Sequence, residues 1–200
     1  NIAPNVANIG KTVAVFSLEM TTAQLMQRII SSETEVSQKN IQTGQLTKDD
    51  WERLAAKAND LTNMKMFLDD TSNISVMEIR SKCRRLKSNK AHGLDLVVID
   101  YLQLMENKRF DQREQQISDI SRNLKGLAKE LEIPVIALAQ LNRSVESRSD
   151  KIPLLSDLRE SGAIEQDADQ IMFIFREEYY KEDTAKKGVA EIHVAKNRSG

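Results

Sequence analysis

The chain has 200 residues, 40% of them hydrophobic, which suits one globular domain with a sizeable core, or one domain with pieces missing. Its 29 basic and 30 acidic residues nearly cancel, so bulk charge gives no argument for nucleic acid, and an aromatic content of 4% argues against a stacking platform for single strands. One cysteine, Cys83, excludes an internal disulfide, and with only His92 and His193 beside it no zinc-type ligand spacing exists. We expect a reducing, cytoplasmic setting, with neither a signal peptide nor an apolar run that could span a bilayer.

The tripeptide Gly10-Lys11-Thr12 looks like the end of a phosphate-binding loop, G-x-x-x-x-G-K-[ST] between a strand and a helix. The motif requires a glycine five residues before Gly10, where this chain has Asn5. The run that follows, residues 13–18, is apolar and β-branched, as in a buried strand. We therefore predict a turn that enters a strand, with Glu19 at the end of that strand.

Apolar runs alternate with segments of helical period, and this alternation is typical of an α/β fold in which crossover helices flank a parallel sheet. Five or six strands are predicted, at residues 13–18, 66–68, 94–99, 134–139, 170–175 and 190–195. The polar segments 103–112 and 142–153 are the least regular, and we expect surface loops there.

Three helices are predicted from their hydrophobic period, at residues 47–61, 76–86 and 113–131. Thr47 and Asp50 suit a capping box at the start of the first helix, and Pro134 stops the third. The faces expected to be buried are Trp51, Leu54, Ala58 and Leu61 in the first helix, Val76, Ile79, Cys83 and Leu86 in the second, and Ile117, Ile120, Leu124, Leu127 and Leu131 in the third.

The outer face of the helix at 76–86 is basic. Nucleic acid or a neighbouring subunit could contact this face, but lysine and arginine normally occupy solvated helix faces, which is the preferred interpretation. The basic residues are Arg80, Lys82, Arg84, Arg85 and Lys87.

Three of the apolar runs end in a polar side chain: "VAVFSLE" in Glu19, "LDLVVID" in Asp100 and "VIALAQ" in Gln140. In an open parallel sheet, ligands bind beyond the carboxyl ends of the strands, so these three groups are expected to project into one site. Asp100 suits a residue that holds the Mg²⁺ of a nucleotide through its water shell. Glu19 would orient or deprotonate the attacking water, and Gln140 would sense the γ-phosphate. For any one of them, the alternative is a polar residue that simply ends a strand at the surface.

Five stretches together resemble a known family. They are "FSLEM", "VVIDYLQLM", "SRNLKGLAKELEIPVIALAQLNRSVE", "DLRESGAIEQDAD" and "AKNRSG". The chain is similar, from Asn1 to Gly200, to the motor domain of the bacterial DnaB-type replicative DNA helicases, a RecA-like ATPase. The resemblance implies a cytoplasmic homo-hexamer that uses ATP and Mg²⁺ to unwind DNA in replication, with single-stranded DNA, a primase and a helicase loader as partners.

The resemblance also implies roles for individual residues. At the nucleotide site it implies Glu19 as the catalytic carboxylate, Arg28 as a γ-phosphate contact, Asp100 as the Walker B aspartate and metal residue, and Gln140 as the coupling residue. In "DLRESG" it implies Arg159, Glu160 and Gly162 as the loop that holds the single-stranded DNA backbone. Lys196 and Arg198 match a basic pair that is inserted into the ATP site of the neighbouring subunit.

These implied roles have physical support and physical alternatives. A loop that meets DNA of every sequence must use backbone amides and charge, which Arg159 and Gly162 offer. Alternatively, Arg159 forms an ion pair with Glu160 or Asp157. Lys196 and Arg198 follow the last strand and can reach outward, but a basic pair there is often merely solvated.

By the same resemblance, "NIAPNVA" matches the helix after the family's Walker A loop. We therefore expect residues 1–200 to be one incomplete RecA-like motor domain that lacks the phosphate loop and later strands and is inactive by itself. Two other classes stay open. One is another RecA-like ATPase, such as a strand-exchange recombinase, and the other is a non-catalytic interaction module.

Overall fold

The computed structural model describes the backbone of residues 1–200 and the side chains of residues 1–158 and 162–200. The chain forms two compact units. One comprises Asn1–Glu106 and Leu127–Leu138, and the other Asn107–Gly126 and Ala139–Gly200. Helix α6 (Arg113–Leu131) contributes residues to both units. The assignment of residues 1–200 to one motor domain stays a prediction.

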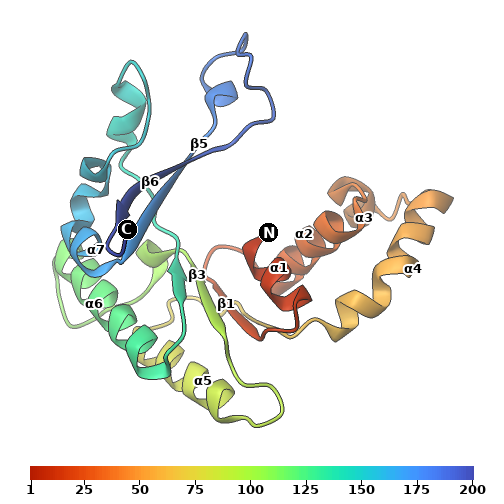
Figure 1. Cartoon of the computed structure of the whole chain (residues 1–200), viewed down its shortest axis with the longest axis horizontal. Helices are drawn as coiled ribbons and strands as arrows, with labels where there is room; N and C mark the ends of the chain where they lie inside the picture. The colour runs from red at the N-terminus through yellow and green to blue at the C-terminus, as the bar shows by residue number, and fades with distance from the viewer. The chain divides into compact units, whose positions relative to one another are not determined.

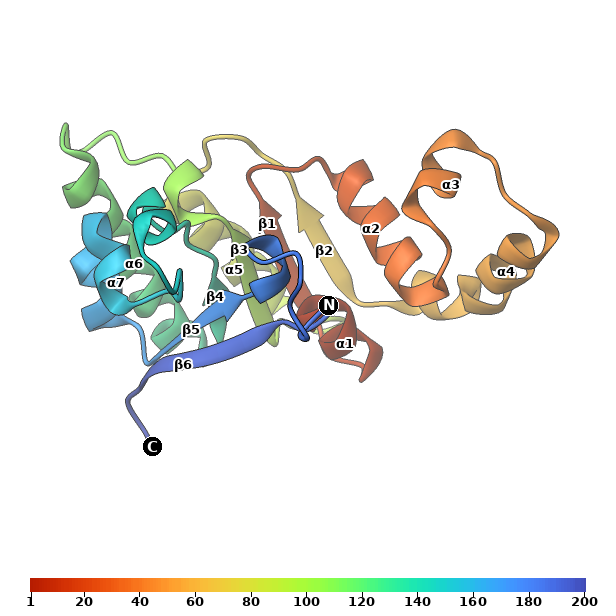
Figure 2. The ribbon, with the colours of Figure 1, turned by 90° about the horizontal axis from the view of Figure 1, so that it is seen from above.

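A four-stranded parallel sheet forms the centre of the first unit, with strand order β2-β1-β3-β4 (Figure 1, Figure 2). Its strands are β1 (Val13–Ser17), β2 (Met66–Asp69), β3 (Leu96–Asp100) and β4 (Val135–Ala137). Every residue of β1 is buried, as expected for an apolar strand covered on both faces of a parallel sheet. The predicted α/β architecture with a mostly parallel sheet is confirmed.

Five helices belong wholly to the first unit: α1 (Ile2–Asn8), α2 (Thr22–Thr34), α3 (Gln38–Thr43), α4 (Lys48–Asn63) and α5 (Val76–Ser88). Helix α1 contacts β1 and β2, whereas α2 contacts α3 and α4. In both views, α2 to α4 extend away from the sheet (Figure 1, Figure 2). A capping box starts α4, where the Thr47 hydroxyl accepts from the backbone N–H of Asp50 and the Asp50 carboxylate accepts from that of Thr47.

The prediction that α4 buries an apolar face is wrong. No residue of α4 is fully buried, and Trp51 is 61% exposed. The helical period shows which face of α4 is apolar, but a helix buries that face only where another element covers it. Here α4 packs on α2, which leaves most of that face open.

The predicted inner face of α5 is buried except for Leu86, which is only partly buried. On the outer face, Arg80 and Arg84 both form ion pairs with Glu130 of α6. The hydrogen bond from Arg84 lowers the pKa of Glu130. Part of the basic face therefore joins two helices, where a wholly solvated face was predicted.

Helix α6 has the predicted bounds, and its five predicted core residues are all buried. No helix in the part of the chain that the structure describes combines the length and the apolar character needed to cross a membrane.

In the second unit, β5 (Gln170–Phe175) and β6 (Glu191–Asn197) form an antiparallel two-stranded sheet. Burial alternates along β5, and its inner face forms a core cluster in which Ile171 and Phe173 pack with Leu158. Helix α7 (Gly162–Asp167) and four short 3-10 turns complete the chain; the turns are η1 (Leu102–Leu104), η2 (Arg143–Ser147), η3 (Leu155–Ser161) and η4 (Glu177–Tyr179).

The last two predicted strands therefore exist, but they pair with each other and do not extend the parallel sheet. The segment between them holds only the short turn η4. Parallel neighbours need a long crossover connection, usually a helix, whereas antiparallel neighbours do not.

Candidate functional site

A turn at Ile9 and Gly10 leads through Lys11 and Thr12 into β1, so the prediction of a turn that enters a strand is confirmed. Gly10 has φ 83°, the left-handed conformation that favours glycine. Thr12 is buried, and its backbone N–H donates to Asp95 Oδ2 at 2.8 Å. Lys11 Nζ lies 3.5 Å from Asp95 Oδ1. The bond from Thr12, followed by the Lys11 charge, lowers the pKa of Asp95. Lys11 thus pairs with a carboxylate that precedes β3.

Glu19 and Asp100 lie at the same edge of the parallel sheet. Ser17, the last residue of β1, is in register with Asp100, the last residue of β3. The backbone N–H of Leu18 donates to the carbonyl oxygen of Asp100 at 2.7 Å, so the pairing continues one residue beyond β1. Both strands run in the same direction, and the residues that follow their carboxyl ends therefore meet there.

Electrostatic interactions connect Asp100 with two other predicted site residues. Burial raises the pKa of the Asp100 carboxyl, the Glu19 carboxylate raises it further, and the Arg28 guanidinium of α2 opposes both effects. Asp100 is half-buried, whereas Glu19 and Arg28 are exposed. The structure thus brings together residues from the end of β1, the end of β3 and α2.

This arrangement fits a divalent cation held with a phosphate ligand. Two carboxylates close together repel each other, and a bound cation would relieve that repulsion and stabilise their ionised forms. Mg²⁺ is commonly bound by one or two carboxylates together with waters and substrate phosphates. The described residues contain no cluster of three or more His, Cys, Asp or Glu that could hold a metal ion by itself. Asp100, with Glu19 nearby, could supply the carboxylates of such a shared site.

Three residues that sequence reasoning missed hold the segment that carries Glu19. The Ser17 hydroxyl donates to the carbonyl oxygen of Met20 at 2.8 Å and closes the turn after β1. Thr21 caps α2, and Asp70, which follows β2, accepts from the backbone N–H of Thr22 at 2.7 Å. The Thr22 bond lowers the pKa of Asp70. Small polar residues directly after a strand and before a helix are the sequence signal for such turns and caps.

The predicted third strand-end residue, Gln140, does not directly follow a strand. Strand β4 ends at Ala137, two residues earlier than predicted. One further ladder bond remains, from the backbone N–H of Leu138 to the carbonyl oxygen of Ile99 at 2.9 Å. Gln140 belongs to the second compact unit, so its role beside Glu19 and Asp100 stays a prediction.

The predicted DNA-binding segment is anchored at Asp157. Arg148 donates to both carboxylate oxygens of Asp157, at 2.9 and 2.6 Å. The side chains of Arg159 and Glu160 lie outside the described residues, so their roles stay predictions. Gly162 is the first residue of α7, its φ is −52°, and an added Cβ would meet no atom within 4 Å. Neither backbone conformation nor internal packing therefore requires glycine at this position.

Lys196 and Arg198 bind the carboxyl end of α7. Lys196 lies inside β6, one residue beyond the predicted end of the strand. It donates to the carbonyl oxygens of Glu165 and Gln166, and Arg198 Nη2 donates to that of Gln166 at 2.7 Å. Cations at the carboxyl end of a helix satisfy its last carbonyl groups and oppose its dipole. Lys196 and Arg198 therefore bond to the protein itself, and the alternative prediction that they are merely solvated is wrong.

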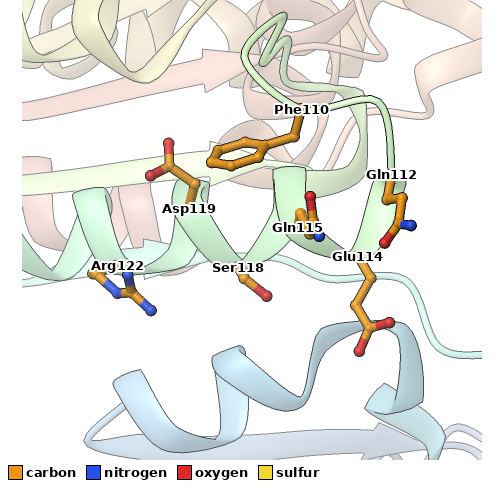
Figure 3. A pocket seen from close by; sticks show the side chains of 7 residues that line it. All are labelled: Phe110, Gln112, Glu114, Gln115, Ser118, Asp119 and Arg122. Carbon is orange, nitrogen blue, oxygen red and sulfur yellow. The ribbon is translucent and has the colours of Figure 1, made fainter.

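A hollow of about 380 Å³ lies beside the first half of α6 and was not singled out from the sequence. The Phe110 ring lies over α6 near Asp119, while Glu114, Ser118 and Arg122 project from another side of the helix (Figure 3). The hollow mixes both charges with one aromatic ring and adjoins none of the predicted site residues in sequence.

A profile of the family described as DnaB-like helicase C terminal domain matches residues 1–200. The chain belongs to this DnaB-like family. It is 50% identical over 203 residues to the replicative DNA helicase DnaB of Geobacillus stearothermophilus and 49% identical to the replicative DNA helicase DnaC of Bacillus subtilis (strain 168). All of this DnaB-like chain is covered in both comparisons, but it spans only 44% of the length of each relative.

Solved structures agree with the DnaB-like assignment. A structure described as an ATPase domain matches with a TM-score of 0.94 and 40% identity, over 99% of this chain and 71% of that one. A DnaB-like replicative helicase, described with its primase interactions, matches with the same TM-score and identity over 99% of this chain and 48% of that one. The RadB recombinase matches at a TM-score of 0.53, and at 17% identity it shows the fold alone, which is RecA-like.

Proposed function

We propose that the full-length protein containing this chain is an ATP-driven replicative DNA helicase, and that residues 1–200 form its RecA-like motor domain. The observation that carries this proposal is the convergence of Glu19 and Asp100 at the carboxyl edge of the sheet in a DnaB-like chain. The test is strand displacement by the full-length protein on a forked DNA substrate. We expect displacement that requires ATP and Mg²⁺. Pairing of homologous strands without displacement would favour a recombinase, and an absence of ATP turnover would favour a non-catalytic module.

In the proposed nucleotide site, Asp100 would hold Mg²⁺ together with the phosphates of ATP, and the ion would supply charge neutralisation when bound. Glu19 orients the attacking water and accepts its proton, and Arg28 contacts the γ-phosphate. Gln140 couples the state of the γ-phosphate to the rest of the motor.

In the proposed DNA site, Arg159, Glu160 and Gly162 contact the backbone of single-stranded DNA. The open space at Gly162 supports this role, because a glycine that the fold does not need allows a ligand to approach the backbone closely. Arg159→Ala should weaken binding about equally for all DNA sequences and reduce the salt dependence by roughly one phosphate contact. A loss that depends on DNA sequence would contradict a backbone contact.

We further propose that Lys196 and Arg198 act in trans, at the ATP site of the neighbouring subunit in a homo-hexamer. A guanidinium matches phosphate oxygens and stabilises the charge that develops during γ-phosphate cleavage, with effects of about 10³ to 10⁵ in kcat in systems that use such a finger. Arg198→Ala and Glu19→Gln subunits should each be inactive alone but partly active when mixed, because some interfaces then pair two intact groups. With subunit exchange verified separately, mixtures that never exceed either variant alone would contradict the role in trans.

A primase and a helicase loader are the remaining proposed partners. The solved DnaB-like helicase described with its primase interactions supports the first. Binding of the full-length protein to the primase encoded in the same genome, measured by calorimetry, tests it.

A further inference from the structure

Asp169, which follows α7, is the carboxylate around which the basic pair is organised. The backbone N–H of Arg198 donates to the carbonyl oxygen of Asp169 at 2.8 Å, and Arg198 Nη1 donates to Asp169 Oδ1 at 3.3 Å. The other carboxylate oxygen, Oδ2, binds Lys125 of α6. Asp169 thus connects the end of β6 with α6 in the second unit.

The charges around Asp169 are consistent with this central position. The hydrogen bond from Lys125 lowers the pKa of Asp169 most, and the charges of Arg198 and Lys196 lower it further. Asp169 is therefore ionised throughout the physiological pH range, and the three cations share one permanent negative charge.

The contacts of Arg198 hold its guanidinium and leave part of it open. Its bonds to Asp169 and to the carbonyl oxygen of Gln166 engage two of the five N–H groups of a guanidinium. The Arg198 side chain is nevertheless 52% exposed. Both acceptors lie near the carboxyl end of α7, so they set the direction of the guanidinium while its other donors stay accessible to a phosphate.

We propose that Asp169 is a positioning residue for Arg198: its carboxylate, braced by Lys125, holds the guanidinium in the orientation in which it meets the γ-phosphate of the neighbouring subunit. The inference rests on the proposed role of Arg198 in trans. Preorganisation matters here because a small misplacement of a group that acts in the transition state lowers the rate strongly. Asp169 itself touches no substrate in this scheme.

The test is steady-state ATP hydrolysis by the full-length hexamer carrying Asp169→Asn. This change keeps the shape of the side chain and the backbone bond to Arg198 but removes the charge. We expect kcat to fall about ten- to hundredfold while KM for ATP stays within about threefold, since the lost orientation acts in the transition state. Asp169→Glu keeps the charge but displaces the carboxylate, so its kcat should lie between those of Asp169→Asn and the wild type.

Glu191→Gln is the matched control. Glu191 lies on the same sheet, and its carboxylate pairs with Lys186 at 2.5 Å and with His193 at 3.3 Å. The Asp169 side chain is 55% exposed and that of Glu191 is 28% exposed. Ion pairs at such positions add little to stability, so the loss of the Glu191 pairs should leave kcat within about twofold. Hexamer assembly is checked by mass photometry. If Asp169→Asn does not assemble, the comparison of Asp169→Glu with wild type decides, and a kcat equal to wild type contradicts the proposal.

A double variant separates positioning from a structural role. In the Arg198→Ala background, Asp169→Asn should have no further effect on the residual kcat measured at high enzyme concentration, because the group that it positions is gone. An equal loss in both backgrounds, or a kcat of Asp169→Asn within threefold of wild type, would overturn the inference. If instead Arg198→Ala alone leaves kcat unchanged, the proposed role of Arg198 in trans is wrong, and the role of Asp169 that depends on it is wrong too. This outcome differs from a failure of the Asp169 proposal alone, in which Arg198→Ala lowers kcat but Asp169→Asn does not.

Discussion

The substitution Asp157→Asn should destabilise the protein by loosening the segment that leads into the proposed DNA loop. The Asp157 side chain is 3% exposed and accepts bonds from Arg148 Nη1 at 2.9 Å, Arg148 Nη2 at 2.6 Å and the backbone N–H of Leu154 at 2.7 Å. Asparagine nearly keeps the shape but cannot pair with the positive charge. The variant therefore leaves Arg148 without a buried negative charge beside it.

The size of the effect follows from these contacts. Breaking a buried ion pair by removing one partner costs about 3–5 kcal/mol. Arg148 is 29% exposed and keeps a bond to the carbonyl oxygen of Ile152 at 2.6 Å, so solvent and backbone stabilise part of its charge. We therefore expect a loss of about 2–3 kcal/mol in the free energy of unfolding, or roughly 4–12 °C in Tm for 150–250 residues.

The loss should also depend on pH in a defined direction. The pKa of Asp157 is lowered from its usual 3.8, chiefly by the hydrogen bond from Arg148. Because the folded state has the lower pKa, the stabilisation by Asp157 is fully present above about pH 4 and is lost as the pH falls through the lowered value. The difference in stability between wild type and Asp157→Asn should therefore shrink on acidification below about pH 4.

Thermal unfolding followed by calorimetry at several pH values measures both effects. Asp150→Asn is the control, because Asp150 lies 3.8 Å from the same arginine and is 59% exposed, so its loss should cost under about 1 kcal/mol. Equal losses for Asp157→Asn and Asp150→Asn, or a difference that does not change with pH, would refute the reasoning.

Three further predictions concern the nucleotide site and the core. In the full-length protein, Glu19→Gln should bind ATP but lower kcat by orders of magnitude, and a kcat within threefold of wild type, under ~1 kcal/mol, would exclude Glu19 as the catalytic carboxylate. Lys11→Ala should change the affinity for ATP less than threefold by calorimetry, because Lys11 pairs with Asp95; a larger loss would reopen Gly10-Lys11-Thr12 as a phosphate contact. Burial raises the pKa of the Cys83 thiol to about 12. Mass spectrometry should therefore find Cys83 unmodified by iodoacetamide at pH 8 until the protein unfolds. Rapid alkylation of the folded protein would contradict the burial of Cys83.

The amino-acid sequence by itself determined the local structure and the position of Glu19 and Asp100 near the ends of two strands. The apolar run before Glu19 and the run that ends in Asp100 became strands, and Thr47 with Asp50 formed the predicted capping box. The turn at Gly10 was predicted because Asn5 stands where a phosphate-binding loop requires glycine. These features depend on backbone preferences and on contacts between near neighbours in the chain, so the pattern of residue types contains them.

Only the tertiary structure decided which surfaces are covered and which partners long side chains choose. The period of α4 did not show that Trp51 stays exposed, because burial depends on what packs against the helix. The alternation of strands and helices did not show that β5 pairs with β6, and no spacing in the sequence shows that Arg198 meets Asp169 and the end of α7. Such contacts join residues far apart in the chain, and their free energy depends on the geometry of the whole fold, which a local pattern does not contain.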